Sequence, residues 1–186
     1  MIPLIIVGVI VLAIVGFLWM TYNGLVKARI RVKEAWAGID VQLKRRSSLI
    51  PNLVETVKGY ASHEKQIFEN VAAARAGLMN AQGPAAAAQA DNVLTQALGR
   101  LFAVAEAYPD LKANTNFLEL QRELTDTEDK IAYSRQFYNS NVGNYNEKIA
   151  VFPNVLLAGM FGFRAEEFYE AEAASREEVN VSFSTT

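Results

Sequence analysis

The chain begins with a long apolar run. No charged side chain occurs before Lys27, and residues 2–20 are almost all apolar. At ~1.5 Å per helical residue the run is about 28 Å long, which matches a hydrocarbon core of roughly 30 Å. Trp19 and Tyr22 lie at its end, where amphipathic aromatic side chains favour the membrane–water interface. Because the cations follow the run and "GFLWMTYNG" offers no persuasive cleavage site, we expect residues 1–22 to be an uncleaved transmembrane anchor rather than a signal peptide.

Two long stretches after the anchor carry apolar residues at helical spacing. In the first, alternating steps of three and four residues form the seam Leu25, Arg29, Val32, Trp36, Ile39, Leu43, Arg46, Ile50, Leu53, Val57, Tyr60 and Glu64. In the second, a seven-residue step connects Phe117, Leu124, Ile131, Tyr138, Tyr145 and Phe152. Such repeats are typical of helices that pack along a supercoiled seam. No convincing strand alternation occurs in this part of the chain, so the pattern predicts an all-α fold.

Capping and breaking residues place the ends of the other helices. Ser62 is a candidate N-cap for a second helix, and Pro84 suits the first position of a third helix. Asn116 and Glu119 have the spacing of a capping box at the start of the last long helix. Pro153 should end that helix, since proline cannot continue the backbone hydrogen bonding.

The helix lengths predict how these elements assemble. We expect an elongated up-down four-helix bundle over residues 23–163, in which only the two long helices reach the membrane as a stalk. The short apolar piece "NVLLAGMFGF" and Phe152 would then return close to the bilayer. Residues 164–186 form an acidic tail that we expect to be largely disordered.

The distribution of charge indicates an orientation. The formal net charge of −2 argues against a nucleic-acid binder. Lys27, Arg29 and Arg31 follow the anchor and are assigned to the membrane interface, with Lys33 just beyond them. The first of these cations lies close enough to interact with anionic headgroups. The positive-inside rule therefore predicts an N-terminus outside and a bundle in the cytoplasm, which corresponds to the bacterial inner membrane.

Two unusual residues lie in the first long helix. Lys44 to Arg46 are about 33 Å along the helix from Tyr22, too far for headgroup contact if the helix is upright. Arg46 occupies a seam position, so we expect a polar layer in the bundle, with a carboxylate such as Glu128 as its partner. Pro51 cannot donate a hydrogen bond to Ser47, and this predicts a kink between the two.

The residues that could support catalysis are sparse. There is no cysteine, so thiolate metal sites are excluded. His63 is the only histidine, so "HEKQI" lacks the second histidine of a zinc helix, and no Ser-His-Asp set can be assembled beyond His63. The carboxylates of the last long helix could bind a metal, but solvated or salt-bridged faces are the better interpretation. We therefore predict no catalytic, cofactor-binding or metal-binding residue, and no enzymatic activity.

Three long strings of the chain closely resemble the LemA family of bacterial membrane proteins. They are "EAWAGIDVQLKRRSSLIPNLVETVKGYASHE", "YPDLKANTNFLELQRELTDTEDKIAYSRQFYNSNVGNYNEKIAVFP" and "GFRAEEFYE". The resemblance implies a four-helix bundle on a single N-terminal membrane helix, with the N-terminus outside. It implies no reaction and no active-site residues. A related magnetosome protein is tied to forming the membrane of its compartment, which gives weight to a membrane-organising role.

These observations lead to one functional hypothesis and one alternative. We expect a non-enzymatic scaffold that contacts membrane lipids through its anchor, self-associates as a homo-oligomer, and organises or remodels the inner membrane. Self-association would use the stalk seam, namely Trp36, Ile39, Leu43, Tyr138, Tyr145 and Phe152. The alternative is an adaptor or regulator of another membrane protein, such as a protease or transporter. No small-molecule substrate is indicated.

Overall fold

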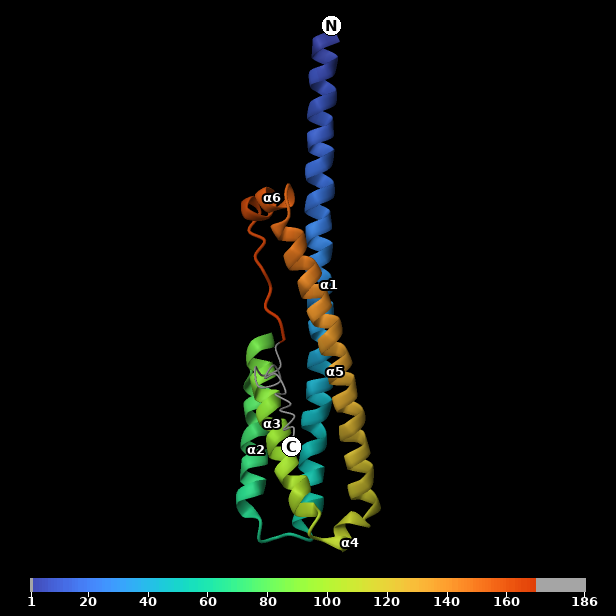
Figure 1. Cartoon of the computed structure of the whole chain (residues 1–186), viewed down its shortest axis with the longest axis vertical. Coiled ribbons are helices and arrows are strands. Elements are labelled where there is room, and N and C mark those ends of the chain that lie inside the picture. Colours follow the sequence, from blue (N-terminus) through green and yellow to red (C-terminus); the bar gives the residue numbers. More distant parts are fainter. Residues whose placement is uncertain (1, 170–186) are drawn as a thin grey trace, which may run out of the picture. The chain divides into compact units, whose positions relative to one another are not determined.

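The computed structural model describes residues 2–169, and all regular secondary structure in that range is helical (Figure 1). This confirms the predicted all-α class. The helices are α1 (Ile2–Lys58), α2 (Lys65–Asn80), α3 (Pro84–Ala105), α4 (Pro109–Lys112), α5 (Thr115–Ala150) and α6 (Asn154–Met160). The described residues divide into unit 1, residues 2–48 and 122–168, and unit 2, residues 49–121 and 169.

The N-terminal part of α1 has no protein around it. Its 18-residue apolar window has a mean hydropathy of 2.8 and none of it is buried, so α1 is long and apolar enough to cross a membrane by length and composition. The large apolar side chains from Leu4 to Met20 are exposed. A water-soluble fold rarely exposes so much contiguous apolar surface, and the bilayer is the solvent that suits it.

Unit 1 is built on α1 and α5, which run antiparallel and side by side (Figure 1). Gly24 on α1 lies beside Lys148 on α5, whereas Arg45, farther along α1, lies beside Glu123, near the other end of α5. The helices bury the apolar residues that the two repeats predict, including Leu25, Val32, Ile39, Leu43, Leu124, Ile131, Tyr138 and Tyr145. Val142 and Ile149 extend the buried side of α5.

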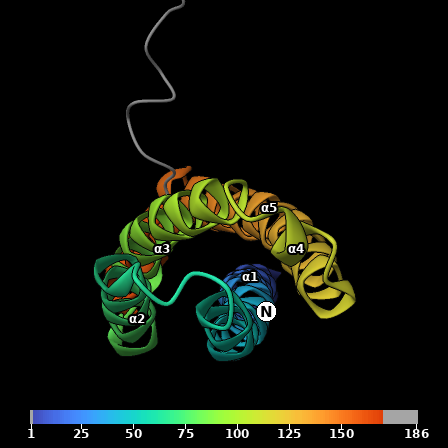
Figure 2. The ribbon, with the colours of Figure 1, turned by 90° about the horizontal axis from the view of Figure 1, so that it is seen from below.

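Unit 2 combines the last turns of α1 with α2, α3, α4 and the first turns of α5. α2 and α3 pack against each other along their length (Figure 2). Phe102 on α3 meets Phe117 on α5 edge to face at 6.2 Å, and Asn114 donates a hydrogen bond to the Tyr60 hydroxyl at 3.0 Å. The core is aliphatic and includes Ile50, Leu53, Val57, Val71, Leu94, Leu98, Leu101 and Leu111.

Helix starts match the sequence prediction at one helix and differ at two. Pro84 is the first residue of α3, as predicted, and Gly83 before it has φ 84°. The N-cap of α2 is Glu64 rather than Ser62. At α5 the capping side chain is Asn114, whose Oδ1 accepts from the Phe117 N–H at 3.1 Å.

The expected tail boundary at residue 164 also changes. Residues 164–168 form an extended return segment that is hydrogen-bonded to α5, and Tyr169 is buried. The Tyr169 hydroxyl donates to Asp91 within unit 2, at 3.3 Å. The packed part of the chain therefore continues to residue 169, and the rest of the expected disordered tail lies outside the described residues.

Candidate membrane-interface site

A cluster of three aromatic rings joins α6 to the end of the apolar part of α1. The Tyr22 ring lies edge to face with the rings of Phe161 and Phe163, and the distances between ring centroids are 5.0 Å and 5.9 Å. Trp19, three residues earlier, is 71 % exposed. Tyr22 and Trp19 thus occupy the level at which aromatic side chains favour the interface, and Tyr22 holds α6 at that same level.

The sequence after Pro153 explains why α6 is short. It ends in a Schellman motif, in which the Phe163 N–H donates to the Ala158 carbonyl at 2.9 Å and Gly162 has φ 71°. A residue with a side chain would be strained at that φ, so glycine suits the position. Leu157 and Ala158 face inward and are buried, whereas the rest of the α6 surface is open.

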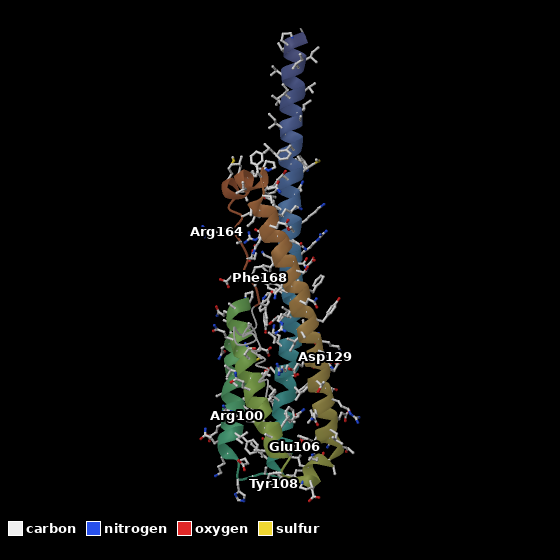
Figure 3. All side chains as sticks on the ribbon, viewed as in Figure 1. Arg100, Glu106, Tyr108, Asp129, Arg164 and Phe168 are labelled. Carbon is white, nitrogen blue, oxygen red and sulfur yellow. The ribbon has the colours of Figure 1, made fainter. Side chains whose placement is uncertain are left out.

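The return segment follows α6 and ties it back to α5 (Figure 3). Asn146 exchanges two hydrogen bonds of 2.9 Å with the backbone of Glu166, one as donor and one as acceptor. The Tyr138 hydroxyl donates to the Glu167 carbonyl at 2.7 Å. These contacts place residues 164–168 along α5, and thereby hold the C-terminal side of α6.

The cations near the anchor divide into two groups. Lys27, Arg31 and Lys33 are exposed, as a headgroup contact requires. Arg29 instead pairs with Glu166, with Nε 3.0 Å from the carboxylate oxygen. The charge of Arg29 is thus offset within unit 1, and its part in the membrane interface remains a prediction.

Comparison with known proteins identifies the chain. The model of the LemA family matches residues 35–183. The chain belongs to the LemA family. It is 30% identical to the magnetosome protein MamQ of Magnetospirillum gryphiswaldense, over 88% of this chain and 71% of that protein. It is 29% identical to MamQ 2 of Paramagnetospirillum magneticum, over 88% and 70%, and 23% identical to protein LemA of Metamycoplasma hominis, over 90% and 79%.

The family assignment and the exposed apolar span together describe a membrane-associated helical protein. The matched region includes α6 and the return segment, whereas the α1 residues of the interface site, from Trp19 to Lys33, precede it. It begins after the anchor, and the anchor is recognised by its own length and composition.

The stalk seam of this LemA-family chain is closed within the chain. The rings of Trp36 and Tyr138 lie edge to face, with their centroids 5.8 Å apart. Ile39, Leu43 and Tyr145 are buried in unit 1. Phe152 is the exception, since α5 ends at Ala150 and Phe152 is 79 % exposed. Placing Phe152 in the seam was therefore wrong, because a seven-residue repeat has meaning only while the helix continues.

The two seam tyrosines have different hydroxyl environments. Burial raises the pKa of Tyr138 to about 12, and the nearby carboxylates of Glu166 and Glu167 act in the same direction. Burial also raises the pKa of Tyr145, with Arg29 opposing and Glu166 reinforcing the shift. The Tyr145 hydroxyl is buried without a hydrogen-bond partner among the described residues, in contrast to that of Tyr138.

The polar layer around Arg46 remains a prediction, and three polar residues of unit 1 are buried. Arg46 is buried, as its seam position predicts, and so are Ser47 and Thr127, whose hydroxyl donates to the Glu123 carbonyl at 2.7 Å. Glu128 is exposed. It therefore cannot belong to a buried layer, because Thr127 takes the inward position and the next residue on a helix points away.

Within residues 2–169, no group of three or more His, Asp or Glu side chains could hold a metal ion, and His63 is exposed. Sequence reasoning placed α6 near the bilayer but missed its contact with Tyr22 and the return segment beyond it. The one available signal was the uncharged, aromatic-rich stretch that precedes Arg164.

Proposed function

We propose that this LemA-family chain is a non-enzymatic, membrane-anchored helical scaffold that associates with further copies of itself and organises the membrane around it. The observation that carries the proposal is the wholly exposed apolar span of α1, followed directly by a well-packed stalk that holds α6 beside it. The similarity to magnetosome proteins supports a role at a membrane.

The exposed surface of the stalk supports self-association through residues other than the seam. The seam side chains are buried within one chain, so a second copy would have to use a different face. Tyr133 and Phe137 lie four residues apart on α5 and are 74 % and 54 % exposed. Neighbouring aromatic side chains of this kind are the residues that protein interfaces favour, and a shared membrane raises the local concentration of copies.

The orientation in this proposal follows from the cations that remain free for the headgroups. Lys27, Arg31 and Lys33 are exposed just after the span. We infer an N-terminus outside and a cytoplasmic bundle at the bacterial inner membrane, following the positive-inside rule. Labelling of single cysteines by a membrane-impermeant reagent in intact cells tests this inference: Ser62→Cys should react only after lysis.

Disulfide crosslinking tests self-association directly, because the natural chain has no cysteine. Phe137→Cys in liposome-reconstituted full-length protein should form homotypic dimers under mild oxidation. Glu128→Cys is the matched control, since Glu128 is also exposed but lies nine residues away, on the opposite flank of α5. Equal crosslinking of both variants, or a strictly monomeric protein in lipid and in detergent, would rule out association through this face.

An adaptor role is the second candidate, favoured by a groove on unit 2. The groove has a volume of about 460 Å³ and lies between α2 and α3, where small side chains leave room for a partner helix. Its lining comprises Asn70, Ala73, Ala74, Gly77, Ala90, Val93, Gln96, Ala97 and Arg100. Photo-crosslinking at Val93 in native membranes separates the roles: one heterologous partner favours the adaptor, whereas homotypic products favour the scaffold.

A further inference from the structure

The outward side of α6 and its flanks is predominantly apolar. Between Lys148 and Arg164 the sequence contains no charged residue. Phe152 and Met160 are 79 % and 78 % exposed, and the same surface includes Val151, Val155, Leu156 and Phe161. An exposed apolar patch bordered by charged residues marks a site that contacts another protein or a membrane.

The position of this patch distinguishes between those partners. Phe161 touches Tyr22 and, together with Val15, Leu18, Trp19 and Asn23, lines a groove of about 460 Å³. Val15 precedes Tyr22 by seven helical residues, which corresponds to ~10 Å toward the bilayer centre. Phe161 is therefore continuous with the apolar surface of the span.

We propose that α6, with Phe152 and Phe161 at its two ends, is an interfacial helix that inserts into the leaflet on the bundle side of the membrane, and that a lipid acyl chain occupies the groove beside Trp19. The surface is continuous with the membrane-spanning part of α1, so the bilayer that surrounds the span also meets α6. Arg164 follows the apolar stretch, where a cation can remain at the level of the phosphates.

This second contact has a physical consequence. α6 lies on one side of α1 and enters only one leaflet, so it adds area to that leaflet alone and restrains the rotation of the stalk about the span. The inference needs membrane association but does not need self-association, and the two can therefore fail separately.

Site-specific labelling of the otherwise cysteine-free chain tests the proposal. Leu156→Cys and Met160→Cys would carry an environment-sensitive fluorophore in full-length protein, with one copy in each phosphatidylcholine–phosphatidylglycerol nanodisc. Both positions are exposed, so the substitutions leave the buried core unchanged. Val9→Cys in the span and Tyr133→Cys on the stalk are the membrane and water references.

Quenchers attached to lipid acyl chains should reduce the fluorescence at Leu156 and Met160 several-fold, as at Val9, and leave that at Tyr133 unchanged. A label at α6 that is quenched only by a water-soluble quencher overturns the proposal. So does a label protected from both quenchers, because a protein segment rather than lipid would then cover α6. Oligomeric state, measured separately by Phe137→Cys crosslinking in liposomes, reports on the proposed scaffold function alone.

Discussion

Asn146 on α5 and Glu166 in the return segment exchange two backbone-directed hydrogen bonds. The Asn146 amide donates to the Glu166 carbonyl at 2.9 Å, and its carbonyl oxygen accepts from the Glu166 N–H at 2.9 Å. One side chain thus satisfies both backbone groups of a residue that lies in no helix or strand. The carboxylate of Glu166 pairs at the same time with Arg29, so α1, α5 and the return segment meet at this residue.

Asn146→Ala should release the return segment from α5. Two backbone groups lose their partners, and we expect unit 1 to lose about 1–3 kcal/mol of unfolding free energy. Hydrogen exchange at the Glu166 amide should become faster, while exchange in the buried middle of α5 changes less. Asn144→Ala is the matched control, since Asn144 is exposed on the same helix. Unchanged protection at Glu166 would show that the return segment is held by other contacts.

The two seam tyrosines should respond in opposite ways to loss of the hydroxyl. Tyr138→Phe removes the bond to the Glu167 carbonyl, so we expect a loss of about 0.5–1.5 kcal/mol. Tyr145→Phe removes a buried hydroxyl that has no partner among the described residues, so the unfolding free energy should stay the same or rise. Chemical denaturation of both variants and of the parent checks the contrast. Equal destabilisation would indicate that water satisfies the Tyr145 hydroxyl.

Part of this arrangement can be predicted from the sequence, because the buried positions of a packed helix recur at a regular spacing. The seven-residue step identified Leu124, Ile131, Tyr138 and Tyr145 as inward-facing, since each position repeats at nearly two turns. The same periodicity identified Arg46 as a buried seam residue. Side-chain type played no part in that inference, and it therefore held for a cation.

Other features of the structure produce no periodic pattern in the sequence. The hydrogen bonds of Asn146 are made to backbone groups that every non-proline residue carries, so no sequence pattern marks Glu166 as the partner. Asn114, Thr115 and Asn116 are all residue types that favour the N-cap position. Which of them caps α5 depends on the path of the backbone after α4. The position of α6 depends on the contact between Tyr22 and Phe161. These residues are far apart in the sequence, so no local repeat predicts their contact.

Alkaline pH should weaken unit 1 through Tyr138. Its pKa is about 12 in the folded state and close to 10 in an unfolded chain, so the folded state retains the proton more strongly. The resulting stability is fully present below pH ~10 and is lost as pH rises through about 12, because the unfolded state ionises first. The unfolding free energy, measured by denaturation between about pH 9 and 12, should fall less steeply with pH for Tyr138→Phe than for the parent.

A carboxylate variant supplies the control for this pH effect. Glu167→Gln removes one of the charges that raise the Tyr138 pKa while keeping the backbone carbonyl that accepts the hydroxyl. Ultraviolet titration of tyrosinate should then show Tyr138 ionising at lower pH than in the parent. If the parent and Tyr138→Phe lose stability with the same slope, another group is responsible for the alkaline transition.

Pro51 interrupts the hydrogen bonding of α1 within a helix that continues to Lys58. Proline carries no N–H that could donate to the carbonyl of Ser47, four residues earlier, and the predicted kink between them remains a prediction. Pro51→Ala restores that donor and removes the ring, and the proline side chain is exposed, so no core packing is lost. We expect the unfolding free energy to rise, by at most about 3 kcal/mol, with a higher thermal midpoint.

Asn52→Ala, a neighbouring exposed substitution that changes only helix propensity, should have a much smaller effect. A lower midpoint for Pro51→Ala would mean that the native path of α1 requires the proline geometry, and that the kink contributes to the fold.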